Sequence, residues 1–366
     1  MVDITADNLS FCYPGATSAT LDGLSFEVAS NSTLSLLGSS GAGKTTLLKV
    51  LSGLLTSAEG SLLFDGKEVL HQPAGERGVS QVFQFPVLYE SISVLDNIAF
   101  PLRALGYGKQ KRRGRAREIA QLLGIDDWLD ERPAALALYQ AQIAGFAKAL
   151  VRPDTALVLL DEPLTAVEPA MKWRLRGLLK RAQEQLQVSM IYVTHDQTEA
   201  LTIANAVSVL HNGVILQTGS AAELYHLPQH SEVARFIGSP SMNFVRASVR
   251  NGELAFAGLP SGTLTLQSAA PGSDLVIADG PVMVGFRPEW ASVTLGQQAQ
   301  VRGLQVVGAD QGVPVGYLQL EYEGQRLQVR HVAANDWPAA GGGADMQIER
   351  CLLFRHERLI GVGAAR

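Results

Sequence analysis

A glycine-rich loop between a strand-like run and a helical pattern constrains this chain more than any other stretch. The loop is Gly38-Ser39-Ser40-Gly41-Ala42-Gly43-Lys44-Thr45-Thr46, after the run 33–37 and before a helical pattern from Leu47. Glycines let backbone N–H groups close around phosphate oxygens, and the following helix N-terminus adds a positive dipole. The Lys44 ammonium can reach β- and γ-phosphates, and the Thr45 hydroxyl can ligate Mg²⁺. The sequence therefore predicts a nucleoside triphosphate site, with a chance glycine-rich turn as the alternative.

Composition agrees with a two-domain intracellular chain. At 366 residues there is room for two domains, and the net charge of −5 shows no basic footprint for nucleic acid. No apolar run of about 18 residues or more is present, and the start of the chain lacks a signal region, so we expect a cytoplasmic location. Cys12 and Cys351 lie far apart, which indicates reduced thiols.

Two further strand-like runs end in polar side chains. The apolar run 156–160 leads directly into Asp161 and Glu162, and the run 189–193 leads into His195. Ligands of open α/β sheets bind beyond such carboxyl ends. Asp161 could hold Mg²⁺, and Glu162 could polarise the water that attacks the γ-phosphate. The alternative for this pair is a helix-capping Asp with a surface Glu. His195 is either structural or a hydrogen-bond sensor of the γ-phosphate.

Three other features each allow two interpretations. Tyr13 could pack at a strand edge or stack on a base. Gln84, at the end of the β-like run 79–84, could be polar filler or could reach Mg²⁺ or the attacking water. The basic run 109–115 precedes a helical pattern over 115–123 that Gly124 would stop. It suits a solvated helix start, or less readily a contact with anionic lipid or a partner.

The chain is β-rich at both ends. The runs 4–13 and 20–28 predict two antiparallel strands. Beyond Asn243, short alternating runs separated by Gly and Pro predict a small antiparallel barrel or sandwich. These runs cover 253–256, 263–267, 281–286, 313–322 and 326–332, with a flexible loop expected at 338–344. No cluster of acids, bases or metal ligands occurs there, so we expect no catalysis in this region.

Together these residues resemble the motif series of ABC transporter ATPases. The matching stretches are 38–46, Gln84, 157–163 and 194–200. The stretches 236–244 and 285–289 resemble the maltose-type sugar importers, and 169–173 resembles the glycerol and glycerol-phosphate uptake group.

The resemblance implies a fold and a division into domains. It implies an α/β P-loop NTPase core with an antiparallel β subdomain and a helical subdomain, followed by a small all-β, OB-like domain for dimerisation and regulation. The nucleotide-binding domain would span 1–240 and the regulatory domain 243–366.

It also implies roles and partners. ATP and Mg²⁺ would be the cofactors, with Tyr13 on the adenine, Gln84 coupling Mg²⁺ to the membrane subunits, and His195 as the switch histidine. The chain would work at the cytoplasmic face of the inner membrane with two permease subunits and, indirectly, a solute-binding protein, and without nucleic acid. It would pair with a second ATPase subunit in a sandwich dimer whose two ATP sites each use one subunit's phosphate loop and the other's signature loop.

One motif departs from the family pattern. Leu-Ser-Gly-Gly-Gln is expected where this chain has Leu136, Ala137, Leu138, Tyr139 and Gln140. A loop that presents a hydroxyl and bare N–H groups to a γ-phosphate cannot do so through these side chains. The loop 165–168 also departs from the usual Leu-Asp. We therefore predict a heterodimer with an ATPase that carries an intact signature loop; the alternative is a regulatory ATP-binding subunit with little hydrolysis of its own.

Overall fold

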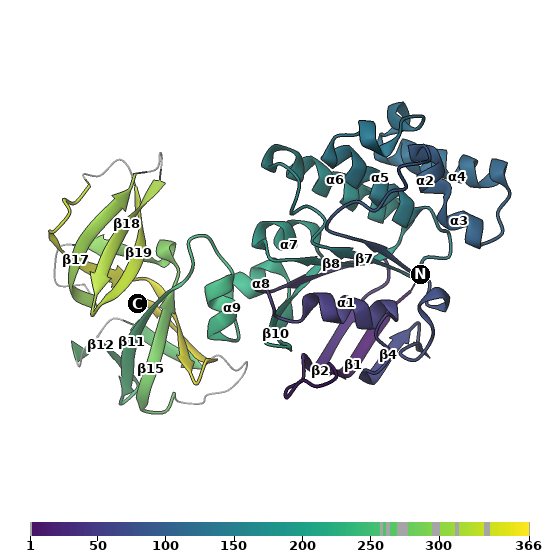
Figure 1. Cartoon of the computed structure of the whole chain (residues 1–366). Coiled ribbons are helices and arrows are strands. Elements are labelled where there is room, and N and C mark those ends of the chain that lie inside the picture. Colours follow the sequence, from purple (N-terminus) through teal and green to yellow (C-terminus); the bar gives the residue numbers. More distant parts are fainter. Residues whose placement is uncertain are drawn as a thin grey trace. The chain divides into compact units, whose positions relative to one another are not determined.

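The computed structural model describes residues 2–256, 259–260, 264–268, 277–294, 301–311, 315–332 and 337–365. The chain forms two compact units, Met1–Ala221 and Ala222–Arg366 (Figure 1). Within the described residues, no helix is long and apolar enough to cross a membrane.

A six-stranded sheet forms the centre of the first unit. Its order is β10-β9-β3-β8-β7-β6, parallel except for the antiparallel β9–β10 pair. The strands are β3 (Thr33–Leu37), β6 (Val79–Val82), β7 (Leu157–Asp161), β8 (Ser189–Thr194), β9 (Ala206–His211) and β10 (Val214–Gly219). β3 and β8 are buried at every residue and β7 at all but its last, as expected of parallel strands covered on both faces, and β7 is continuously apolar up to Asp161.

Successive side chains of these strands enter two different cores. Leu157 and Leu159 pack with the helix α1 (Lys44–Ser52) and with a four-stranded antiparallel sheet of order β2-β1-β4-β5. That sheet comprises β1 (Ile4–Phe11), β2 (Leu21–Val28), β4 (Glu59–Phe64) and β5 (Lys67–Glu68), which confirms the predicted pair at 4–13 and 20–28. Val158 and Leu160 face a second core built with helices. The alternation follows from the period of two along a strand.

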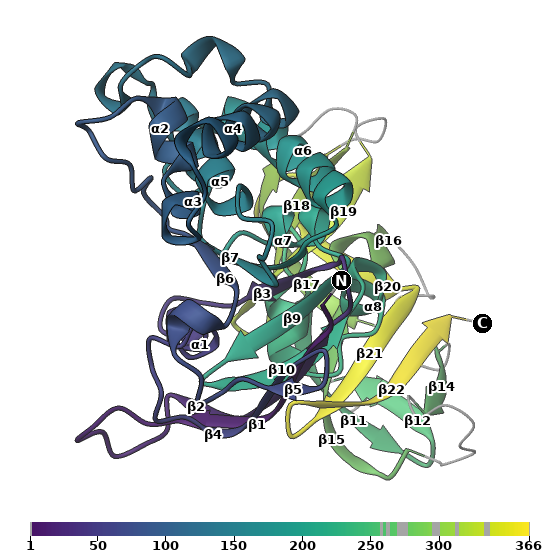
Figure 2. The same ribbon diagram turned by 90° about the vertical axis from the view of Figure 1, so that its right-hand side faces the viewer.

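The helices on that second side form the predicted helical part, visible at the top of Figure 2. They are α2 (Val94–Ala99), α3 (Pro101–Ala104), α4 (Lys109–Leu123), α5 (Leu138–Leu150) and α6 (Pro169–Leu186), with α7 (Gln197–Ile203) beside β3 and β8. Short 3₁₀ turns occur at Ala74–Glu76, Asp126–Trp128 and Pro133–Ala135. As predicted, α4 stops at Gly124, whose φ of 65° closes the helix. Pro169 is the first residue of α6, a position that favours proline.

The second unit begins with two short helices and continues as two antiparallel sheets around one core. The helices are α8 (Ala221–His226) and α9 (Ser231–Phe236). The larger sheet has the order β13-β12-β11-β15-β21-β22-β14. Its strands are β11 (Asn243–Arg250), β12 (Glu253–Phe256), β13 (Leu259–Pro260), β14 (Leu264–Ser268), β15 (Gly280–Phe286), β21 (Arg350–Arg355) and β22 (Arg358–Ala365). The smaller sheet has the order β16-β20-β17-β18-β19. Its strands are β16 (Ala291–Thr294), β17 (Val301–Asp310), β18 (Val315–Tyr322), β19 (Gln325–Val332) and β20 (Gly343–Ile348). A 3₁₀ turn lies at Pro288–Trp290. The expected all-β domain is therefore present, while residues 263 and 313–314 of the predicted runs lie outside the described residues.

Three expectations differ from the structure. The strand expected over 79–84 ends at Val82, so Gln84 lies in the following loop. The helix expected over 115–123 begins earlier, at Lys109, so the basic run 109–115 forms the start of α4, in agreement with its interpretation as a solvated helix start. The loop expected over 338–344 is shorter, since β20 already begins at Gly343.

One arginine fastens the two short helices to the β-rich part of the second unit. Arg287 is fully buried, and its guanidinium donates to the carbonyl oxygens of Tyr225 (3.0 Å), Ala234 (3.2 Å) and Ile237. It also lies 4.2 Å from the Tyr225 ring centroid. Burial lowers the pKa of Arg287 to about 10. These bonds join α8 and α9 to the strand that precedes Arg287.

We expect a chain cut after Ala221 to stay soluble and to bind ATP, and a chain cut after Asn243 to be less soluble. The longer fragment keeps α9 but loses Arg287 and the β-rich core against which the fully buried Ala234 packs. Sedimentation and thermal melting of both fragments test this. A fragment 1–243 that is as soluble as 1–221 and melts higher would contradict it.

Candidate functional site

The phosphate loop is shaped by close packing of backbone on backbone. It leaves β3 at Leu37 and enters α1 at Lys44. A Cβ at Gly38 would collide with the Leu210 carbonyl oxygen, and Gly43 holds a φ of 104° as the N-cap of α1. The loop therefore needs glycine at both places, and its N–H groups converge at a helix N-terminus.

The Lys44 ammonium lies within this loop. Its Nζ donates to the carbonyl oxygens of Gly38 and Ser39, both at 2.9 Å, and lies 3.8 Å from Glu162 Oε1. Burial lowers the pKa of Lys44, although the carboxylates of Glu162 and Asp161 oppose the shift. A partly desolvated cation held by the backbone of a glycine-rich loop at a helix N-terminus is suited to a polyanion, so these residues fit the phosphates of a nucleotide.

Two carboxylates stand at the end of β7. Burial, and secondly the neighbouring Glu162, raise the pKa of Asp161. A cation at this place would relieve both effects, so the site fits Mg²⁺ held by Asp161 and by Thr45, which is exposed in the first turn of α1. Glu162 has a φ of 45°, rare for a non-glycine residue, and its N–H donates to the Val193 carbonyl oxygen at 2.9 Å.

The Glu162 side chain is oriented by two partners. Its Oε2 accepts a hydrogen bond from Thr165 Oγ1 at 3.2 Å and lies 3.0 Å from His195 Nδ1. His195 comes directly after β8, the strand beside β7. The structure thus brings Lys44, Glu162 and His195 together in one site, as the sequence pattern suggested.

Behind His195 lies a buried carboxylate that sequence reasoning missed. Glu199 accepts hydrogen bonds from Tyr192 Oη (2.9 Å) and Thr194 Oγ1 (3.0 Å) and forms an ion pair with Lys172 of α6 (3.0 Å). Burial and this carboxylate raise the pKa of Tyr192 well above its ordinary value. The network connects the His195 loop to the start of α6. No local pattern indicated it, because its members come from three separate elements.

Tyr13 contacts the helix that follows the phosphate loop. The Tyr13 hydroxyl lies 3.3 Å from Thr46 Oγ1, and its ring packs edge-on against Phe11, with centroids 4.8 Å apart. The ring is 36% exposed beside the phosphate-loop helix, where a nucleotide base could stack.

Gln84 is half-buried, and its side chain makes no hydrogen bond with another residue in the described part of the chain. A role for Gln84 in holding Mg²⁺ stays a prediction.

The signature-like loop forms the start of α5 without the usual cap. Ala137 is the N-cap and contributes no side-chain acceptor; instead Gln140 Oε1 accepts from the Ala137 N–H at 2.8 Å. Leu138 is 45% exposed, and Tyr139 packs against Trp128 with ring centroids 6.2 Å apart. The helix N-terminus therefore carries bulky side chains where the family pattern has glycines.

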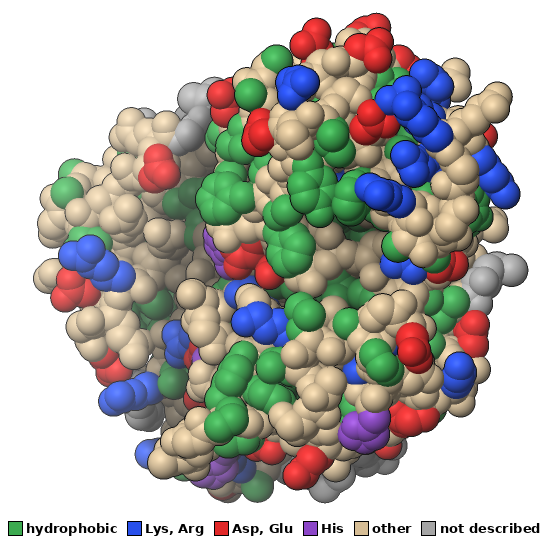
Figure 3. All heavy atoms as spheres, turned by 45° about the vertical axis from the view of Figure 1, so that its right-hand side comes forward, with side chains coloured by type: hydrophobic (Ala, Val, Ile, Leu, Met, Phe, Trp, Pro, Cys, Tyr) green, Lys and Arg blue, Asp and Glu red, His purple; other side chains and the backbone are tan. Residues whose placement is uncertain are grey.

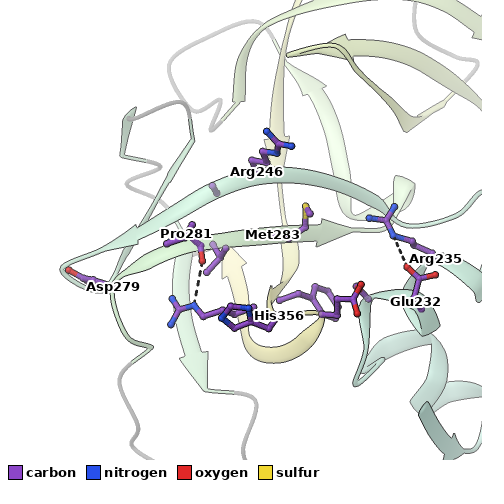
Figure 4. A pocket seen from close by; sticks show the side chains of 13 residues that line it. Glu232, Arg235, Arg246, Asp279, Pro281, Met283 and His356 are labelled. Carbon is purple, nitrogen blue, oxygen red and sulfur yellow. Dashed lines mark hydrogen bonds and ion pairs between the residues drawn. The ribbon is translucent and has the colours of Figure 1, made fainter. Parts of the chain in front are cut away.

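A separate hollow of about 570 Å³ lies in the second unit, between α9 and the larger sheet (Figure 4). Its charged side chains are largely engaged within the protein. Glu232 pairs with Arg235 at 3.5 Å, Asp279 accepts from the Asn251 N–H at 2.9 Å, and Arg355 donates to the Ala278 carbonyl oxygen at 2.7 Å. The features suited to a triphosphate therefore lie in the first unit.

Comparisons with known proteins agree with this geometry. Residues 21–165 match the family described as ABC transporter, and residues 238–290 match the MalK OB fold domain. The diacetylchitobiose uptake system ATP-binding protein MsiK of Streptomyces coelicolor is 35% identical over 79% of this chain and 75% of its own length. The sn-glycerol-3-phosphate import ATP-binding protein UgpC of Vibrio cholerae is 38% identical over 70% of this chain and 67% of its own.

A third relative in sequence and one solved structure are also similar to this chain. The trehalose/maltose import ATP-binding protein MalK of Thermococcus litoralis is 37% identical over 78% of each chain. The structure of cbiO1 from Clostridium perfringens, part of the ABC transporter complex cbiONQ, superimposes with a TM-score of 0.57 and 25% identity, over 63% of this chain and 92% of that one. This chain belongs to the ATP-binding subunits of the maltose-type ABC importers, which are ATP hydrolases coupled to transport.

Proposed function

We propose that this chain binds Mg-ATP through its own phosphate loop and hydrolyses it to energise import of a small polyol or sugar, with glycerol or glycerol phosphate as the best candidate. The observation that carries the hydrolytic role is the contact of Glu162 with both Lys44 and His195. Lys44 would neutralise the β- and γ-phosphates. Glu162, oriented by Thr165 and His195, would accept a proton from the attacking water. Tyr13 would stack on the adenine.

The substrate proposal rests on the names of relatives and on the resemblance of the segment 169–173 to the glycerol uptake group. The UgpC relatives are named for sn-glycerol-3-phosphate import, whereas MsiK and MalK are named for sugars. In the uptake-group segment 169–173, Trp173 is 68% exposed at the start of α6. The choice among these substrates would be made by the permeases and a solute-binding protein.

A groove of about 240 Å³ beside β6 supports a peripheral position on two permease subunits at the cytoplasmic face of the membrane. Val87 and Lys148 line it, and Lys148 Nζ donates to the Val87 carbonyl oxygen at 3.0 Å. Burial lowers the pKa of Lys148. Phe85 is 61% exposed in the same loop, and Figure 3 shows hydrophobic side chains gathered on this face. An exposed apolar groove of this kind suits a cytoplasmic helix of a permease.

The dimer would contain two unlike ATPase subunits. The start of α5 offers neither a serine hydroxyl nor unobstructed N–H groups to a γ-phosphate across the interface. A partner with an intact signature loop would complete the site built on Lys44 and Glu162. The site built on the partner's phosphate loop would face the altered signature loop of this chain and would lack these donors.

The Lys44→Ala variant tests the proposal. Loss of a charge-assisted contact worth about 1.5–3 kcal/mol should weaken Mg-ATP binding roughly tenfold to a hundredfold. Lys49, exposed on the same helix, provides the matched control Lys49→Ala, which should bind ATP like the wild type. Calorimetry on the full chain measures both. Equal affinity of wild type and Lys44→Ala would refute the assigned site.

A further inference from the structure

A basic segment over α3 and α4 remains unexplained by nucleotide binding. Residues 103–117 contain seven basic and no acidic side chains, although the whole chain carries a net charge of −5. The basic side chains are Arg103, Lys109, Lys111, Arg112, Arg113, Arg115 and Arg117. In Figure 3, Lys and Arg side chains gather beside the hydrophobic side chains on the same face.

Helix stability does not account for this arrangement. The first turn of α4 has no acidic residue and contains Lys109, Lys111 and Arg112. A helix N-terminus carries positive partial charge, so each exposed cation there costs on the order of 0.3–1 kcal/mol, whereas an acid would stabilise. Gly108 is the N-cap and offers no side-chain acceptor. A helix start that served only for solubility would do better with acidic residues.

Contacts within the protein account for only some of the seven basic side chains. Arg113 forms a two-point ion pair with Asp96 of α2, at 2.8 and 2.6 Å, and Arg115 pairs with Glu118 at 3.0 Å. Lys111 Nζ lies 4.5 Å from the Tyr107 ring centroid. Within the described residues, the other four basic side chains form no ion pair, and three of them are exposed. Charge is therefore available to an external anion.

The basic segment is continuous with the apolar groove. Lys148, which lines the groove, lies 4.7 Å from the Tyr89 ring centroid, and Tyr89 packs on Phe100 at 4.7 Å. Phe100 directly precedes α3, which leads through the exposed Leu105 to α4. A groove that receives a permease faces the membrane, so the neighbouring cations face it too.

We propose that the exposed basic side chains of this segment, with Phe100 and Leu105, bind the anionic headgroups of the inner membrane surface. This rests on the proposed docking of the groove to permeases. Cations beside exposed apolar side chains suit a lipid interface, where each basic residue near an anionic surface adds about 1 kcal/mol. The net negative charge of the chain disfavours nucleic acid as the ligand.

Flotation of the full chain with vesicles tests the proposal. Vesicles of phosphatidylcholine with about one third phosphatidylglycerol should bind the wild type, and pure phosphatidylcholine should not. The variant Lys109→Glu/Lys111→Glu/Arg117→Glu, at three exposed positions of α4, should lose about a hundredfold in partition coefficient. Binding should also fall between 0.1 and 1 M salt, as the Debye length shrinks from about 10 to about 3 Å.

The control carries the same charge change on α6, as Arg174→Glu/Lys180→Glu/Arg181→Glu, all exposed positions in the first unit. It should bind anionic vesicles like the wild type. The α4 variant should still unfold in one cooperative thermal transition, because its changed positions are exposed. Equal binding to neutral vesicles, equal loss in both variants, or binding only when permease is present would each overturn the lipid contact. Mg-ATP affinity, measured on the same samples, reports separately on the proposed function.

Discussion

Replacing Glu162 with Gln should leave ATP bound and stop its turnover. The amide is nearly isosteric, so the Lys44 contact and the phosphate loop should keep their geometry, but Gln cannot accept a proton from the attacking water. A positioned general base contributes about 10²–10⁴ in rate. In a complex with an ATPase subunit that has an intact signature loop, we expect a loss in kcat of at least about a hundredfold. Phosphate release assays and ATP binding on the same sample measure the two effects.

Glu168 supplies the matched control for this prediction. It follows Glu162 in the same loop, is exposed, and is the N-cap of α6 without a side-chain cap bond. Glu168→Gln should keep the turnover of the wild type. The equivalent Glu→Gln change in the partner subunit should also do little, because that subunit's site depends on the altered loop at Ala137. A complex that hydrolyses ATP at the wild-type rate with Glu162→Gln would show that another group is the base.

The phosphate site could be anticipated because parallel strands align their ends. Lys44, Glu162 and His195 follow β3, β7 and β8, which are neighbours in the order β3-β8-β7. Carboxyl ends of parallel strands meet at one edge, so three separate local patterns converge there. The continuous apolar runs predicted both the strands and their burial. The side-chain roles remain predictions that the experiments above test.

Other features depend on contacts between distant parts of the chain, which local patterns do not contain. Gln142 of α5 donates to the Phe83 carbonyl oxygen at 3.2 Å, just after β6 ends at Val82. Gln84 therefore follows a strand end that is contacted by a helix far along the chain. Arg287 likewise joins the two short helices to the β-rich sheet through carbonyl oxygens that precede it by 50 to 62 residues. The helical pattern was predicted only from Arg115 for a different reason: residues 109–115 contain no apolar side chain, so periodicity cannot mark the start of α4 there.

Restoring the signature loop should raise the ATPase rate of the chain acting alone. In Ala137→Ser/Leu138→Gly/Tyr139→Gly, a hydroxyl returns to the N-cap and two N–H groups become accessible at the start of α5. Losing one transition-state donor costs about 10²–10³ in rate, so we expect a gain of that order in a homodimer.

The variant should also remain folded. A serine N-cap adds about 0.5–2 kcal/mol of stability, which offsets part of the cost of two glycines and of the lost contact between Tyr139 and Trp128. Adding Glu162→Gln to the restored chain is the internal control: it should remove the gained activity, because the restored loop acts on a site whose base is Glu162. If the unmodified chain already hydrolyses ATP as fast as the restored one, the altered loop is competent, and the case for an unlike partner fails. If the restored chain is folded, dimeric and still slow, the deficiency lies elsewhere at the interface, and residues 165–168 become the next segment to exchange.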